Sequence, residues 1–194
     1  MANVLAIHSV GASLATYLRN TYPGDLRAAH PCEFNLFASA EMGSTDERGT
    51  TLSLYLYRIT MNEYVRNGRP THDLAGGAAP LSVDLHFLLT VWAGNVLAEQ
   101  TILAWAMRQL HQRPVLDRST LSPEGGWDLS DIVHVIPAEL SHEDMMRIWD
   151  ALEPSYRLSL SYIARVVRID PDPVPSGVPV VARNFVLSEP EGAR

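Results

Sequence analysis

The hydrophobic pattern is clearest between Leu81 and Trp92, where it predicts a strand. Every second position on one side of an extended chain is apolar, namely Val83, Leu85, Phe87, Leu89 and Val91. The opposite side is mixed and carries Asp84, His86, Leu88, Thr90 and Trp92. We therefore expect a central strand that is covered on one face and partly covered on the other.

After Gly94 the apolar period changes from two residues to 3.6, which predicts a helix from Asn95 to His111. The Asn95 side chain can cap this helix by accepting hydrogen bonds from backbone N–H groups of its first turn, and Pro114 stops it. The expected buried stripe of this helix consists of Val96, Leu103, Met107 and Leu110, widened by Ile102 and Ala106.

The N-terminal part of the chain predicts one helix and two strands. Asn3 can cap a helix that carries Val4, Ile7, Gly11, Leu14 and Leu18 on one face. Gly11 lowers helix propensity by about 1 kcal/mol relative to alanine, so it marks either a closely packed neighbour or a weak spot. Residues 32–38 and 52–61 alternate as strands around a polar turn at 43–49, and we expect them to form an antiparallel hairpin. Residues 62–80 form a loop long enough to be either functional or disordered.

The C-terminal part predicts a strand at 132–136, a helix that begins after Ser141, and a strand at 158–167. The buried face of the helix is expected to hold Met145, Ile148, Trp149 and Leu152. Beyond Asp170, repeated prolines prevent a regular helix, so residues 171–194 are expected to form a proline-rich arm.

Taken in order, these elements predict an α/β (α+β) fold with a single domain over residues 1–170. We expect a mixed, mainly antiparallel sheet of four to five strands, with about three helices packed mostly on one face. A chain of 194 residues with 46% hydrophobic content is long enough to bury one sizeable core.

Charge and cysteine content restrict the partners. The chain has 22 acidic and 15 basic residues, a net charge of −7, and all of its basic residues are dispersed arginines, which disfavours nucleic-acid binding. Cys32 is the only cysteine and cannot form an intramolecular disulfide. No segment has the roughly 20 consecutive apolar residues that span a bilayer, and the apolar start lacks the positive region of a signal peptide, so no membrane contact is expected.

The sequence predicts no catalytic, cofactor-binding or metal site. None of its seven histidines has the spacing of a metal motif, and His30 with Cys32 is better explained by a structural turn. His86 fits a strand histidine, because it falls on the more polar side of its strand. Gly125 and Gly126 lack the preceding strand and following helix of a phosphate-binding loop.

Several of these segments also resemble a known family. The strand L-H-F-L-L-T at 85–90 and the helix L-A-W-A-M-R-Q-L-H-Q-R-P-V-L at 103–116 resemble the N-terminal domain of cap proteins of phage-tail-like contractile injection systems. Residues 3–7, 52–57 and 156–162 fit the same pattern in the same order, so the resemblance covers about residues 2–170. It implies a tail-terminator-like fold and a structural role, while a small-molecule-binding domain and an enzyme of unrecognised type remain the alternatives.

The resemblance also implies partners. A ring, expected to be a hexamer, would close the distal end of the sheath and inner tube, fix tail length and stabilise the extended sheath. Its partners would be the terminal sheath subunits, the terminal tube subunits and its own copies, with no nucleic acid and no membrane. The cap would assemble in the cytoplasm and become part of a particle that can be released from the cell.

Two regions are candidate interfaces of such a ring. On the central helix, Ala98, Ile102 and Trp105 extend beyond the expected core line, and tryptophan is enriched at interface hot spots. A larger core within one subunit is the alternative for these three residues. In the arm, the apolar and β-branched residues are candidates for strand pairing with another chain, with folding back on its own sheet edge as the alternative: Val178, Val180, Val181, Phe185, Val186 and Leu187.

Overall fold

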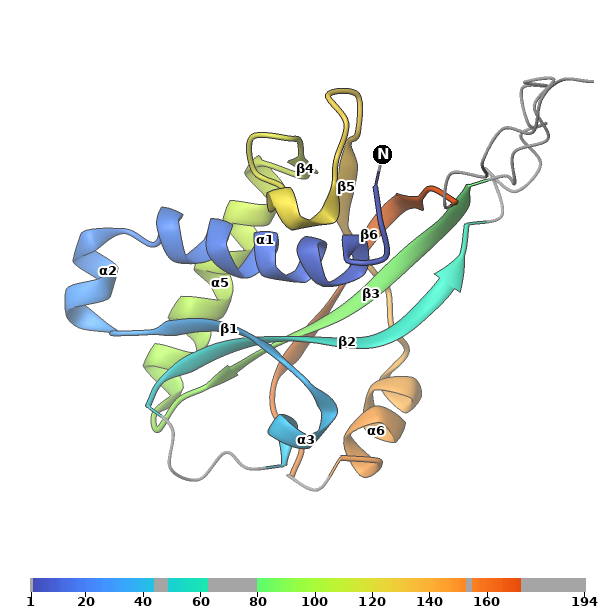
Figure 1. The fold of residues 1–194 in the computed structure, drawn as a ribbon. Helices are drawn as coiled ribbons and strands as arrows, with labels where there is room; N and C mark the ends of the chain where they lie inside the picture. Colours follow the sequence, from blue (N-terminus) through green and yellow to red (C-terminus); the bar gives the residue numbers. More distant parts are fainter. Residues whose placement is uncertain (1, 44–48, 63–79, 153–154, 172–194) are drawn as a thin grey trace, which may run out of the picture.

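A computed structural model describes residues 2–43, 49–62, 80–152 and 155–171. Its centre is a twisted six-stranded sheet with the order β1-β2-β3-β6-β5-β4 (Figure 1). The strands are β1 Glu33–Phe37, β2 Thr51–Met61, β3 Leu81–Trp92, β4 Val115–Leu116, β5 Val133–Pro137 and β6 Ser159–Ile169. The mixed α/β fold is confirmed, and the strand beyond the predicted four to five is the two-residue β4.

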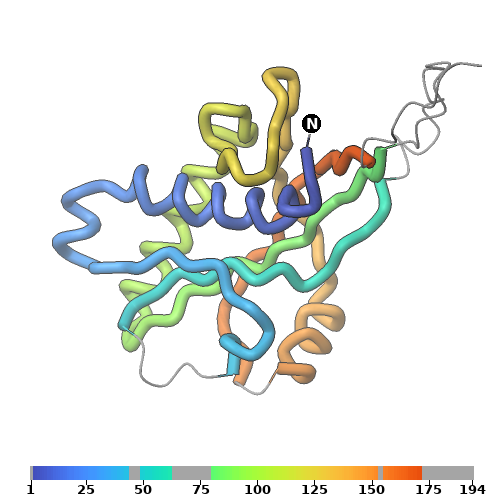
Figure 2. The backbone as a smooth tube through the Cα atoms, viewed as in Figure 1, coloured from blue at the N-terminus to red at the C-terminus, as the bar shows by residue number. Residues whose placement is uncertain are grey.

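Helices pack on both faces of this sheet. They are α1 Ala6–Thr21, α2 Gly24–Ala29, α3 Ser39–Met42, α5 Val96–Gln112 and α6 His142–Asp150, with a short 3₁₀ helix η1 at Pro123–Gly125. The path of the backbone shows α1 and α6 on different sides of the long β3 strand (Figure 2). No helix within the described residues is long and apolar enough to cross a membrane.

Local capping follows the sequence for two of the three predicted helices. The Asn95 Oδ1 accepts a hydrogen bond from the Ala98 backbone N–H at 2.8 Å, and the Ser141 Oγ accepts one from Asp144 at 3.1 Å. Asn3 acts earlier than predicted, because its Oδ1 accepts from the Leu5 N–H at 2.7 Å before α1 begins. Satisfied N–H groups at these helix starts explain why the boundaries could be read locally.

The predicted hairpin of β1 and β2 is wrong, because these two strands are parallel. Their register runs from Glu33 opposite Thr51 to Phe37 opposite Tyr55. A parallel pair needs a crossover connection of about a dozen residues, and residues 38–50, which include α3, provide it. All other neighbouring strands are antiparallel.

The main core lies between the sheet and the two longest helices. Leu14 and Leu18 of α1 and Ile102 and Leu110 of α5 are buried in one cluster with the apolar side of β3. A Cβ added to Gly11 would lie 2.8 Å from the Leu36 Cδ1. The closely packed neighbour, rather than a weak spot, therefore explains this glycine.

A smaller core lies on the opposite face, under α3 and α6. Its buried members are Phe37, Met42, Leu88, Trp92 and Trp149. Of the predicted α6 face, Trp149 is buried, while Met145, Ile148 and Leu152 are partly buried against this cluster. The expectation that the helices pack mostly on one face therefore describes α1 and α5, and not α3 and α6.

Candidate assembly surfaces

The predicted interface residues of α5 lie in the core of their own subunit. Ala98, Ile102 and Trp105 are 3%, 0% and 3% exposed. The Trp105 ring stacks edge-on against Tyr22 and Phe34, with centroid separations of 4.8 and 5.7 Å. Such pairs add to the energy of burial, so the wide apolar stripe stabilises the fold. These side chains have no surface left for a neighbouring subunit, which corrects the expected interface and favours the larger core.

The buried face of α5 is rotated relative to the predicted stripe. Leu103 and Leu110 are buried as expected, but Val96 is 64% exposed and Met107 is 44% exposed. Leu97, which follows Val96, is 68% exposed. The face that meets the sheet is thus centred on the side of Trp105 and Ala106. This rotation leaves apolar side chains on the surface at the start of α5, directly after β3 ends.

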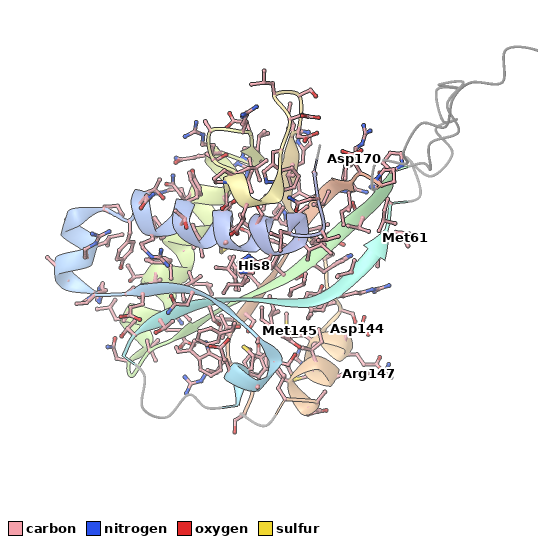
Figure 3. All side chains as sticks on the ribbon, viewed as in Figure 1. His8, Met61, Asp144, Met145, Arg147 and Asp170 are labelled. Atoms are coloured by element: carbon pink, nitrogen blue, oxygen red, sulfur yellow. The ribbon has the colours of Figure 1, made fainter. Side chains whose placement is uncertain are left out.

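A second exposed apolar region lies at the far end of the sheet. Ile59 and Met61 of β2 are 48% and 58% exposed, and Leu81 at the start of β3 is also exposed. Figure 3 shows Met61 at the same end of the sheet as Asp170, which follows β6. β1 pairs only with residues 51–55 of β2, so the described structure leaves the rest of that strand edge uncovered. Apolar edge strands of this kind are contact sites for other chains.

A buried carboxylate shapes this end of the sheet, and sequence reasoning missed it. The Asp84 Oδ1 accepts from the Asn62 Nδ2 and from the Val166 backbone N–H, both at 2.9 Å. The Arg165 Nε lies 3.7 Å from the other carboxylate oxygen. Val166 has a φ of 62°, a costly backbone conformation for a β-branched residue, at a bulge in β6. The sequence signal for this buried carboxylate was the position of Asp84, an acidic residue within an otherwise mainly apolar strand.

Two open grooves border the sheet. One, of about 680 Å³, lies between α1 and the outer edge of β1, and is lined by Ala12, Ala15, Thr16, Arg19, Glu33, Asn35, Leu36 and Glu41 among others. The other, of about 770 Å³, lies between α5, α6 and the start of β6. Its lining includes Met107 and Leu160, together with Asp144 and Met145 of α6, which are labelled in Figure 3.

The remaining candidates for chemistry have structural surroundings. Burial raises the pKa of the Cys32 thiol to about 12, whereas a nucleophilic or metal-binding thiolate needs a lowered pKa. The His86 Nε2 lies 3.0 Å from the Thr60 hydroxyl, and burial together with the Arg58 charge lowers the pKa of its imidazole. No group of three or more potential metal ligands occurs among the described residues.

The glycine turn before β5 is fixed by a polar network. The Trp127 Nε1 donates to the Ser9 Oγ at 2.9 Å, and the Ser9 Oγ donates to the Ser122 carbonyl at 2.9 Å. Gly126 has a φ of 70°, which a glycine adopts without strain. A Cβ on Gly125 would lie 2.4 Å from the Trp127 Nε1. This segment is therefore a turn, as the sequence indicated, and hydrogen bonds to Ser9 attach it to α1.

The arm residues Val178, Val180, Val181, Phe185, Val186 and Leu187, and most of the predicted loop at 62–80, lie outside the described residues. The candidate surfaces that the structure does describe are the exposed apolar ends and the two grooves. They belong to a domain of one six-stranded sheet, and no group of three or more potential metal ligands lies in its described part. The class that this defines is a mixed α/β domain with helices on both faces of one sheet. Comparison with known proteins identifies its relatives.

The sequence model of the Pvc16 N-terminal domain family matches residues 9–183, and the chain belongs to this family. No curated protein matches the sequence. The fold is similar to that of the sheath/tube terminator of PVC, an extracellular contractile injection system, in its extended state. That chain is 17% identical with a TM-score of 0.58, and the match covers 96% of this chain and 65% of that one.

The tube-terminating cap of the anti-feeding prophage, AFP, has a similar fold. It is 16% identical with a TM-score of 0.56, and the match covers 93% of this chain and 59% of that chain. This chain therefore spans less than two thirds of the length of either structure. The resemblance to a cap domain and the tail-terminator-like fold are confirmed.

Proposed function

We propose that this chain is a structural cap of a contractile injection tail, which closes the distal end of the sheath and inner tube as a ring, expected to be a hexamer. The observation that carries this proposal is the agreement between family membership and a likeness, over nearly all of this chain, to part of a sheath/tube terminator and of a tube-terminating cap. The role is geometric rather than enzymatic. A ring that matches the layer beneath it blocks further addition, fixes tail length and holds the sheath extended.

The exposed apolar regions support a ring, because a ring needs two different surfaces on each subunit in head-to-tail contact. Ile59 and Met61 lie at the end of the sheet where β3 begins, and Val96 and Leu97 follow the end of β3. Because Met61 pairs with Val83 and Ile59 with Leu85, about 23–30 Å of β3 separates these residues from its end at Trp92. They are therefore independent surfaces. Stable contacts commonly bury about 1,200–2,000 Å² in total, so neighbouring side chains must add to each.

Introducing a negative charge on one surface at a time can distinguish the two surfaces. Met61→Asp and Val96→Asp should each abolish the ring, because an unpaired carboxylate would be buried in one contact. An equimolar mixture should recover a dimer, since each variant keeps the surface that the other has lost. Sedimentation velocity measures both results. Leu129→Asp, at a highly exposed loop position, is the matched control and should leave the ring intact.

The cap role itself is tested on particles. We expect the chain to assemble in the cytoplasm, to rest on the last sheath and tube layers, and to leave the cell with any particle that is released. Cryo-electron microscopy of particles made with and without the chain should show a six-subunit ring at one end and, without it, tails of variable length or contracted sheaths. One copy per tail end, or an unchanged length distribution without the chain, contradicts the proposal.

We further propose that residues 171–194 are an arm that pairs with another chain through Val178, Val180, Val181, Phe185, Val186 and Leu187. The family match continues to residue 183, so the first half of the arm belongs to the matched region. Its apolar and β-branched content suits a strand, and backbone hydrogen bonds to a sheet edge provide attachment. A terminal sheath subunit or a second copy of the cap can accept it.

Truncation tests the arm. Deleting residues 171–194 should abolish attachment to tail ends while the domain keeps its unfolding transition. Deleting only residues 188–194, which spares the apolar segment, is the control and should leave attachment intact. Tail-end occupancy by electron microscopy and thermal unfolding by circular dichroism report the two effects separately. Attachment that survives the longer deletion would falsify an exchanged arm.

A further inference from the structure

The groove between α5, α6 and the start of β6 combines apolar side chains with negative charge. Met107 of α5 and Leu160 of β6 supply apolar surface in a groove of about 770 Å³. Glu139 and Asp144 also line it, and both are exposed. Among the described residues of this lining there is no arginine or histidine to balance them. Such a surface favours an apolar partner that carries positive charge.

The groove continues the exposed face of α5. Val96 and Met107 are both exposed and lie eleven positions apart, about three helical turns, so they are on the same face of the helix. The proposed ring surface at the start of α5 therefore extends along the helix into the groove. The groove supplies neighbouring side chains that a stable contact of this surface needs.

The edge of β2 offers the matching chemistry. Ile59 and Met61 are exposed apolar residues, and Arg58 beside them is exposed as well. Two further arginines at this end of the sheet each have a carboxylate partner: Arg165 with Asp84, and Arg168 with Asp170. Arg58 therefore gives the described part of this end a net positive charge. The highly exposed Leu129 differs, because it follows Asp128.

The two surfaces also match in which face of the sheet carries each kind of side chain. Arg58 and Ile59 are neighbours in β2, so their side chains point to opposite faces. Ile59 pairs with Leu85, which is buried under α1 and α5, so Arg58 points to the α6 side. In the groove, Met107 comes from α5 and Asp144 from α6. Both surfaces are thus apolar on the α5 side and charged on the α6 side.

The sheet order places these surfaces on opposite edges of one subunit. β2 and β6 pair with β3 on its two sides. β1 pairs with β2 only along residues 51–55, and β5 pairs with β6 only along residues 162–165, so no described strand covers the end of β2 or the start of β6 on those sides. The two surfaces therefore cannot meet within one subunit. Two copies placed edge to edge, with their sheets facing the same way, bring arginine to carboxylate and apolar side chain to apolar side chain.

We propose that the edge of β2 of a second copy, with Arg58 and Ile59, occupies the groove between α5, α6 and the start of β6. Ile59 packs on Met107, and Arg58 pairs with Glu139 and Asp144. Because each copy has one such edge and one such groove, the contact is head-to-tail and repeats around a ring. This inference rests on the proposed cap function and names the residues that join its subunits.

Exchanging the charges tests the contact first. Arg58→Glu and Glu139→Arg should each weaken assembly at least about tenfold, because each brings like charges together. Both changes in one chain should restore assembly to within about threefold of wild type, since every contact again pairs opposite charges. Sedimentation velocity measures assembly, and circular dichroism checks that each variant is folded. Asp150→Arg, at an exposed position at the end of α6 outside the groove, makes the same change in net charge as Glu139→Arg and should assemble normally.

Crosslinking then locates the contact without relying on charge. Ile59→Cys and Met107→Cys are combined in the full-length chain with Cys32→Ser and treated with a short bismaleimide. Because the two positions lie on different edges of a subunit, the link should join copies and give a ladder of subunits on a denaturing gel. Either cysteine alone can give no product larger than a dimer, and is the control.

The outcomes separate this contact from the cap function. Tail-end occupancy by electron microscopy is recorded for the same variants, so that rings that form only on tails are counted. If the wild-type chain forms a ring on tails, but the combined charge exchange assembles no better than the single changes or no ladder forms, the contact is wrong and the cap function stands. If the wild-type chain does not occupy tail ends, the cap function fails, and restored assembly with a ladder still supports the contact between copies.

Discussion

The two faces of the sheet differ in how completely they are covered. Under α1 and α5, one continuous cluster contains most of the buried apolar side chains of the described chain, including three interlocked aromatic rings, Tyr22, Phe34 and Trp105. Under α3 and α6, the cluster has five buried members. The first face contains the larger core, and the second is covered by two short helices with one buried residue each, Met42 of α3 and Trp149 of α6.

The two faces also differ in the hydrogen bonding of their buried polar groups. On the first face the Trp127 Nε1 donates to the Ser9 Oγ, whereas the Trp149 Nε1 is buried without a hydrogen-bond partner among the described residues. A buried donor without an acceptor carries a desolvation penalty. Among the described residues, the unsatisfied buried side-chain donor thus lies on the face with the smaller cluster. The comparison predicts that substitutions on the two faces will have unequal effects on the free energy of unfolding.

The largest expected loss of stability comes from a substitution in the main core. Trp105→Ala should lower the free energy of unfolding by about 3–5 kcal/mol, because it removes a ring packed against Tyr22 and Phe34 and leaves a cavity. Chemical denaturation monitored by circular dichroism measures this. Trp149→Ala in the smaller cluster should lose less. A Trp105→Ala protein of normal stability that fails to assemble would restore the interface assignment that the structure disfavours.

Two matched tryptophan-to-phenylalanine substitutions compare the two faces through smaller changes in the free energy of unfolding. Trp127→Phe should cost about 1–3 kcal/mol, since it removes a donor and leaves the buried Ser9 hydroxyl with one partner fewer. Trp149→Phe should cost less than about 1 kcal/mol, because it also removes an unsatisfied buried N–H. Chemical denaturation gives both losses of free energy from the shift in the unfolding midpoint, provided that the dependence of the free energy on denaturant concentration is unchanged. Equal losses would show that the Trp149 indole has an acceptor.

The smallest effect concerns pH on the second face. Burial, with the nearby Arg58 charge, lowers the pKa of His86 below its ordinary 6.5, and the Asp84 carboxylate partly opposes this. The unfolded chain therefore binds a proton more readily than the folded one, so stability is retained above pH 6.5 and falls as the pH drops below it. His86→Gln should flatten this part of the stability profile, and His134→Gln, at an exposed position of β5, should leave it unchanged.

Much of the local structure was readable from the sequence. The alternation from Val83 to Val91 predicts β3, and the caps Asn95 and Ser141 fix where α5 and α6 begin, because both signals depend on residues within a few positions of one another. The family resemblance likewise rests on contiguous motifs, such as residues 85–90 and 103–116. The cap assignment came from that resemblance and not from periodicity.

Tertiary structure alone decided the rest. The hydrophobic pattern of β1 and β2 is the same for parallel and antiparallel pairing, so only their register in the folded sheet, from Glu33 opposite Thr51 to Phe37 opposite Tyr55, reveals their direction. The apolar stripe of α5 runs nearly halfway round the helix, so the sequence does not determine which side of the helix faces the sheet. In the structure Trp105 packs against Tyr22 and Phe34, and Val96 is exposed. The groove beside β1 is lined by α1 and β1, two elements that α2 separates in the sequence, so the periodicity of neither element contains it. Periodicity specifies which side of an element is apolar, whereas its partner is fixed by long-range packing.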